Sequence, residues 1–110
     1  MYAEAEIVDY TESACIGASF TVSAMTRKRV SVDGSTLSGL SRFEFVGTSG
    51  KVLLRVYDAT GETKLLDTTV NAVDEYVLSL NDYQLYASYG GILLDITYRS
   101  DSGTLTVDPS

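Results

Sequence analysis

The chain has 110 residues, of which 45% are hydrophobic and 21% charged, with a formal net charge of -7 and a pI near 4.3. This length and composition predict a single domain over residues 1–110 with one core, and they exclude global disorder. The acidic charge repels phosphate backbones, so we expect no nucleic-acid partner. Cys15 is the only cysteine, which excludes an internal disulfide.

The N-terminal residues are acidic and carry no visible targeting signal. Four carboxylates fall within the first twelve residues, without a basic start or an uninterrupted apolar run. No segment reaches the roughly 20 apolar residues of a membrane span. We therefore expect synthesis in a cytoplasm, no membrane partner, and a possible acidic N-terminal arm over residues 1–12.

Apolar and polar residues alternate through the first half of the chain, which predicts strands. The first run covers residues 16–24, and a shorter run ends at Val32. Asp33-Gly34 then gives a strong turn signal, because both residues tolerate positive φ. A strand around Phe43 follows, and the glycine-bounded segment 47–50 predicts a hairpin from it to the next strand.

The second half of the chain shows the same alternation. A turn at 58–61 precedes four further expected strands, at 65–70, 76–80, 92–98 and 104–107. Helical periodicity is nearly absent. Seven to eight short strands at this spacing predict an all-β fold, a single antiparallel β-sandwich or a barrel.

Residues 50–57 and 90–97 share one pattern, a glycine-led strand with three apolar residues on one face. Their flanking residues differ, so we interpret the two segments as separate strands that share a pattern typical of buried strands, and not as an internal repeat. The opposite face carries Arg55 in one copy and Asp95 in the other. We predict that the two strands are antiparallel neighbours with Arg55 opposite Asp95, and that these charges pair.

The sequence contains no histidine, which argues against catalysis. Its absence removes the commonest general base, the commonest zinc ligand and any Ser/His/Asp or Cys/His dyad. Asp58, Thr60 and Glu62 stand at alternate positions, as ligands do in calcium loops, but turn chemistry selects the same residues. We expect no enzyme activity, no catalytic residue, no cofactor and no metal.

Arg27, Lys28 and Arg29 form the only positive cluster in the chain. One interpretation is a docking site for an acidic partner surface, including the acidic arm of a second copy. The other is an exposed strand end, where charges discourage edge-to-edge pairing. The sequence leaves both open.

Tyr83, Tyr86 and Tyr89 recur every third residue, shortly after Tyr76. This spacing places the rings along one side of a helical turn or twisted loop, where they offer flat faces to a sugar or a protein groove. The alternative is that they plug the open end of the sandwich. The chain has no tryptophan, the residue that sugar-binding platforms often use.

The strand series between Lys51 and Val107 resembles jelly-roll-type β-sandwiches. The resemblance rests on the segments 52–57, 65–70, 76–80 and 92–98. Such folds are used by carbohydrate-binding modules and by small accessory proteins of phage particles, including decoration and cement proteins of the capsid. The resemblance therefore implies a jelly-roll-like sandwich in one of these two settings.

Three observations favour the phage setting: the missing signal peptide, the stand-alone length and the missing tryptophan platform. We expect a non-enzymatic structural protein of the virion, such as a capsid decoration protein. It would form homo-oligomers and bind a repetitive protein surface of the capsid. The alternative is a carbohydrate-binding module whose tyrosine-rich loop contacts a glycan.

Overall fold

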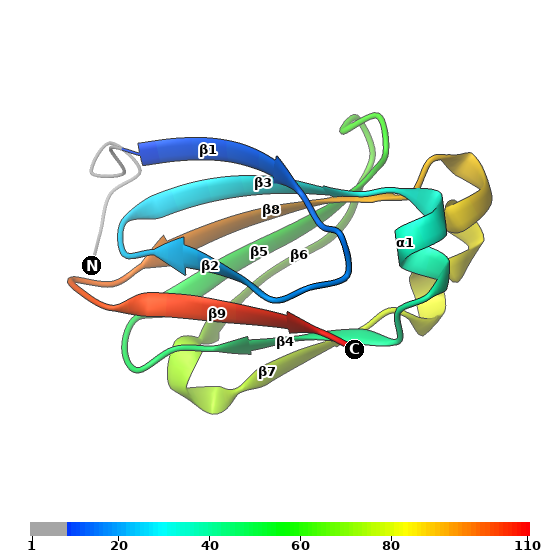
Figure 1. The fold of residues 1–110 in the computed structure, drawn as a ribbon. Coiled ribbons are helices and arrows are strands. Elements are labelled where there is room, and N and C mark those ends of the chain that lie inside the picture. The colour runs from blue at the N-terminus through cyan, green and yellow to red at the C-terminus, as the bar shows by residue number, and fades with distance from the viewer. Residues whose placement is uncertain (1–8) are drawn as a thin grey trace.

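The computed structural model describes residues 9–110, which form two β-sheets packed face to face (Figure 1). The five-stranded sheet contains, in spatial order, β1 (Asp9–Ala14), β3 (Thr26–Val32), β8 (Ile92–Arg99), β5 (Lys51–Asp58) and β6 (Lys64–Asn71). The four-stranded sheet contains β2 (Phe20–Ser23), β9 (Thr104–Pro109), β4 (Arg42–Val46) and β7 (Tyr76–Ser79). The prediction of an all-β, two-sheet fold is confirmed.

These residues contain nine strands, more than the seven to eight expected. The additional strand is β1, all six residues of which are exposed, so it lacks the apolar alternation that reveals a half-buried strand. It overlaps the expected acidic arm at residues 9–12, and the rest of that arm lies outside the described residues. β1 also pairs in parallel with β3, whereas a purely antiparallel sandwich was predicted.

The remaining eight strands form four antiparallel pairs, each joining an early strand to a late one. β2 pairs with β9 and β4 with β7 in the four-stranded sheet, while β3 pairs with β8 and β5 with β6 in the five-stranded sheet. Two further ladders, β4 with β9 and β5 with β8, join these pairs within each sheet. The core lies between the sheets and is built from alternate apolar residues of the strands.

The two similar segments found in the sequence are β5 and β8, and they are antiparallel neighbours with Arg55 opposite Asp95, as predicted. Their leading glycines have a structural reason. A Cβ on Gly91, whose φ is +96°, would lie 1.9 Å from the carbonyl oxygen of Val32, and one on Gly50 would lie 2.4 Å from that of Arg99. Both strands thus begin where the chain passes tightly against a neighbouring backbone.

The predicted hairpin across residues 47–50 is wrong, because β4 and β5 belong to different sheets. The connection between them is anchored by buried Tyr98, whose hydroxyl donates a 2.6 Å hydrogen bond to the carbonyl of Ser49. A Cβ on Gly47 would lie 2.9 Å from that hydroxyl. The glycine-rich link therefore passes from one sheet to the other at an end of the sandwich, around a core tyrosine.

The predicted strand over residues 16–24 is shortened to β2. Ile16 is 84% exposed, so the apolar alternation that suggested a longer strand continues into a solvent-exposed connection. Sequence alternation alone does not distinguish a strand from an exposed loop of similar composition.

Helical segments close one end of the sandwich, α1 (Gly34–Ser38) and the 3-10 helix η3 (Asn81–Tyr89) (Figure 1). Asp33, expected to start a turn, is the N-cap of α1, and its carboxylate accepts hydrogen bonds from the Thr36 backbone N–H and the Ser35 hydroxyl. The Gln84 amide of η3 donates to the carbonyls of Leu37 and Leu40, which ties the two segments together. No helix within residues 9–110 is long and apolar enough to cross a membrane.

Candidate functional site

The outer face of the five-stranded sheet, which points away from the core, carries most of the positive charge of the chain. The chain has eight Lys and Arg residues in total. Strand alternation and register place six of them on this face, Arg27, Arg29, Lys51, Arg55, Lys64 and Arg99. We call these six residues and the surface around them the basic face.

One row of the basic face alternates in charge across all five strands. Each residue in the row is the direct register partner of the next, in the order Glu12, Arg29, Asp95, Arg55 and Asp67. Opposite charges on neighbouring strands attract, so the row favours this register over one slipped by a residue. Six cations against these three carboxylates leave a positive excess of three among the described residues of the face.

Asp95 is the buried centre of the basic face, with its side chain 1% exposed. Arg27 donates to it twice, from Nε to Oδ1 at 3.0 Å and from Nη2 to Oδ2 at 2.7 Å. Arg29 Nε lies 3.9 Å from Oδ2. Such a paired, planar contact holds both side chains in one geometry.

The predicted ion pair between Arg55 and Asp95 is wrong, although their register is right. Arg55 Nε lies 3.5 Å from Asp67 Oδ1 instead. Lys64 also binds Asp67 at 2.8 Å, and its hydrogen bond is the main cause that lowers the pKa of the Asp67 carboxyl below its usual range. Because the two arginines of β3 already occupy the Asp95 carboxylate, Arg55 turns toward the other neighbouring strand.

Tyrosine rings lie beside the arginines of the basic face. The guanidinium of Arg27 is 5.4 Å from the centre of the Tyr10 ring, and that of Arg29 is 5.9 Å from the Tyr57 ring. These separations are within the range of cation–π attraction. Arginine and tyrosine are both enriched in protein interfaces, so the composition of this face suits protein binding.

The positive cluster found in the sequence is divided between two faces of β3. Arg27 and Arg29 lie on the basic face, while Lys28 projects to the other side and donates a 3.0 Å hydrogen bond to the carbonyl of Thr21 in β2. The Lys28 ammonium also lies 5.3 Å from the centre of the Phe20 ring. β3 is flanked by β1 and β8, so the edge that Lys28 covers is that of β2.

The three candidate tyrosines lie on η3, where a 3-10 helix brings residues spaced by three onto one side. Tyr83 and Tyr86 are half-buried against the core, and burial raises the pKa of the Tyr83 hydroxyl. Tyr89 is 75% exposed. The tyrosines and the arginines therefore belong to different parts of the fold, an end helix and a sheet face.

The segment with Asp58, Thr60 and Glu62 at alternate positions is a hydrogen-bonded turn. The Asp58 carboxylate accepts from the Thr60 hydroxyl at 2.7 Å, and this bond is the main cause that lowers the Asp58 pKa. Within residues 9–110, no three acidic or cysteine side chains are grouped closely enough to hold a metal ion. The turn thus accounts for the residue types that suggested calcium.

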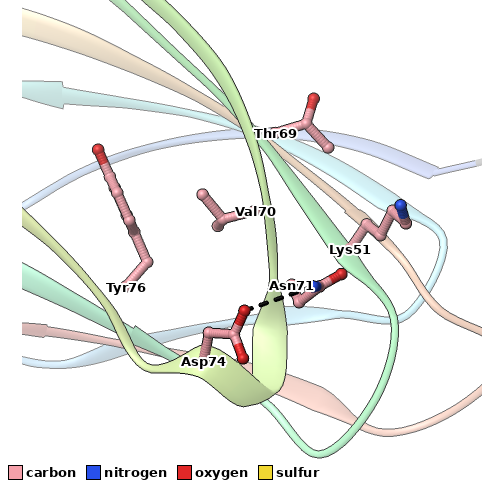
Figure 2. A pocket seen from close by; sticks show the side chains of 6 residues that line it. All are labelled: Lys51, Thr69, Val70, Asn71, Asp74 and Tyr76. Carbon is pink, nitrogen blue, oxygen red and sulfur yellow. Dashed lines mark hydrogen bonds between the residues drawn. The ribbon is translucent and has the colours of Figure 1, made fainter.

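Two open hollows follow the sides of the sandwich, where the edges of its sheets face each other. One lies between β1 and β2 and has a volume of about 370 Å³. The other, between β6 and β7, has a volume of about 360 Å³ (Figure 2). Tyr76, noted in the sequence only as a neighbour of the tyrosine series, is the aromatic residue of this second hollow.

Sequence reasoning missed Lys51, Lys64 and Arg99 as parts of one charged surface. The available signal was their position in strands, because Lys51 shares the face of Arg55, and Arg99 that of Asp95. Strand order, which brings these segments together, is not visible in that pattern.

The chain matches no protein-family model, and no curated protein is significantly similar to it.

Proposed function

We propose that this chain is a non-enzymatic assembly protein that docks through its basic face onto an acidic, repeated protein surface. The setting that fits best is a phage virion, with the chain as a capsid decoration or cement protein. The observation that carries the proposal is the concentration of six of the eight cations on one sheet face of a chain whose net charge is -7.

Such a distribution makes the molecule electrically polar. A positive face on an acidic protein is attracted to negative surfaces, while its remaining surface repels them, so charge selects the orientation of docking. Arg27, Arg29 and Tyr57 supply flat, partly ordered side chains that lose little freedom on contact. Many identical weak contacts on a repetitive lattice then add up to stable binding.

We also propose that the two-sheet fold is jelly-roll-like. The support is the strand pairing, in which β2 to β5 pair in reverse order with β6 to β9 and successive pairs alternate between the sheets. A four-pair antiparallel ribbon wrapped in this way is the layout of a double-sheet jelly roll. β1 then extends one sheet beyond that layout.

The test uses particles purified from the source of this chain. Mass spectrometry of the particles is expected to detect the chain, and a salt wash is expected to release it, because salt screens charged contacts. Recombinant chain is then added back to the washed particles at low salt, and rebinding is measured by co-sedimentation. The proposal fails if the chain is absent from the particles or if rebinding is insensitive to salt.

Two variants locate the docking face. Replacing Lys51, Arg55 and Lys64 together by glutamate reverses the charge at the exposed side of the basic face and is expected to abolish rebinding. Arg42→Glu changes an exposed cation on the other sheet and is expected to rebind normally. Equal loss in both variants would contradict docking through the basic face, and release by nuclease would indicate nucleic acid as the partner.

A further inference from the structure

The hollow between β6 and β7 has the chemistry of a small ligand site. It lies between the free edges of the two sheets, since β6 pairs only with β5 and β7 only with β4 among the described strands. Its lining residues are Lys51, Thr69, Val70, Asn71, Asp74 and Tyr76. Its volume of about 360 Å³ falls in the range of about 300–1,000 Å³ found for ligand sites.

The backbone between β6 and β7 positions two of these side chains. The short 3-10 helix η2 (Ala72–Asp74) ends at Glu75, which has φ 54° and ψ 55°. A left-handed conformation is unfavourable for a residue with a Cβ, and such residues are often found at functional sites. This reversal lets Asp74 and Tyr76, on either side of Glu75, both line the hollow.

The hollow combines an apolar wall with hydrogen-bonding groups. Figure 2 shows the Val70 side chain pointing toward the Tyr76 ring, with the Asn71 amide and the Asp74 carboxylate close together below them. The tyrosine ring is tilted against core Phe45 at a centroid distance of 6.1 Å, which restricts its orientation. The 3.4 Å contact from Asn71 Nδ2 to Asp74 Oδ2 holds a donor and an acceptor side by side.

The balance of charge indicates an uncharged ligand. Lys51 and Asp74 supply one positive and one negative group at the rim, and the other lining side chains are neutral. A sugar ring has the matching chemistry, because its C–H face packs on an aromatic ring while its hydroxyls both donate and accept hydrogen bonds.

We propose that the β6–β7 hollow binds one unit of a neutral saccharide. The C–H face of the sugar packs on Tyr76 and Val70, and its hydroxyls bind Asn71 and Asp74. This site uses Tyr76 and not the three tyrosines of η3. It goes beyond docking through the basic face, does not rest on it, and stands or falls separately.

The test is a titration of the full chain followed by two-dimensional amide NMR. The probes are oligosaccharides of glucose, mannose, galactose and N-acetylglucosamine, added one at a time. At least one is expected to shift amides of residues 69–76 in a saturable manner. If none of them does so up to its solubility limit, or if the shifts centre on residues 83–89, the proposal is overturned.

Substitutions then test the named contacts. Asp74→Ala and Asn71→Ala each remove hydrogen bonds to the sugar and are expected to weaken binding about tenfold. Both residues are exposed, so both variants are expected to fold, and either one alone suffices as the test. Tyr76→Phe keeps the ring and is expected to retain most of the affinity.

Two control variants match these changes away from the hollow. Glu62→Ala removes an exposed carboxylate from the β5–β6 turn, and Tyr89→Ala removes the exposed tyrosine of η3. Neither is expected to change the affinity. Weaker binding by Tyr89→Ala, with Asp74→Ala unchanged, would assign the sugar to η3 and contradict the proposal.

Discussion

Arg27 binds Asp95 through two parallel hydrogen bonds, although the residues directly opposite Asp95 in the sheet are Arg29 and Arg55. Arg27 lies opposite Thr97, two pairs along the β3–β8 ladder from the Arg29–Asp95 pair, and reaches Asp95 diagonally. A long side chain can cover such a diagonal in a twisted sheet. The arginine that hydrogen-bonds Asp95 is therefore not one of the two that lie directly opposite it in the sheet.

This geometry predicts different coupling energies for the two arginine–aspartate pairs. Because Asp95 is buried and Arg27 is about one third exposed, a double-mutant cycle on Arg27 and Asp95 is expected to give about 2 kcal/mol of coupling. The same cycle on Arg55 and Asp95 is expected to give about 0.5 kcal/mol or less. Urea unfolding of the single and double alanine variants measures both, and a larger value for the Arg55 pair would contradict the structure.

Lys28 is predicted to keep the protein from associating through β2. Its ammonium donates a hydrogen bond to the Thr21 carbonyl and lies over the Phe20 ring. Both of these residues belong to β2, an edge strand of the four-stranded sheet. Lys28→Ala uncovers both groups, so sedimentation velocity is expected to show concentration-dependent oligomers beyond those of the unmodified chain. Lys51→Ala removes an equal charge from β5, on the outer face of the five-stranded sheet and away from β2, and serves as the control, which is expected to leave the sedimentation profile unchanged.

The N-cap of α1 is predicted to make stability depend on pH in the acid range. Hydrogen bonds, above all that from the Thr36 backbone N–H, lower the pKa of the Asp33 carboxyl below its ordinary value of 3.8. The folded state therefore binds this proton less readily than the unfolded state. The resulting stability is fully present above pH 3.8 and is lost as the pH falls through the lower folded pKa.

Thermal unfolding at a series of pH values tests this contribution of Asp33. Asp33→Asn keeps a capping oxygen but does not titrate, so its melting temperature is expected to fall less steeply with acidification than that of the unmodified chain. Asp58 and Asp67 remain in both proteins and provide the shared background, because their pKa values are lowered in the same direction. Identical slopes for the two proteins would show that the cap does not contribute.

Gly91 is predicted to be intolerant of any side chain. A Cβ there would lie 1.9 Å from the Val32 carbonyl oxygen. The residue that carries it would also have a backbone φ of +96°, which is unfavourable for any residue with a side chain. Gly91→Ala is expected to destabilise the fold by about 4 kcal/mol or more, because backbone on β3 or β8 must move. Gly17→Ala is the matched control, since Gly17 has a φ of +88° but open space around it.

The control separates conformational strain from steric overlap. Gly17→Ala is expected to reduce stability by about 1 kcal/mol, the effect of positive φ alone. Denaturant midpoints of the two variants measure the difference. Equal effects at the two positions would mean that the close approach of Gly91 to Val32 is absent in solution.

The alternation of residue types by itself predicted the strands that bury one face, although not always their ends, and the side chains of those strands that face the core. Val52, Leu54 and Val56 identified β5, and the matching run identified β8 and the register that places Arg55 opposite Asp95. This was possible because burial of one face imposes a period of two on the sequence. β1 has no buried face and therefore gave no such signal.

The tertiary structure decided which distant residues share a surface. The basic face joins side chains from β3, β5, β6 and β8, and the hollow of Tyr76 joins the edges of two sheets. These groupings depend on the order of strands within each sheet and on the reach of each side chain. Arg55, for example, pairs with Asp67 on β6 and not with Asp95 on β8. Alternation along one strand shows only whether a residue faces the core or the solvent, because burial acts on each strand separately. Charge pairing depends instead on which strands become neighbours in the sheet.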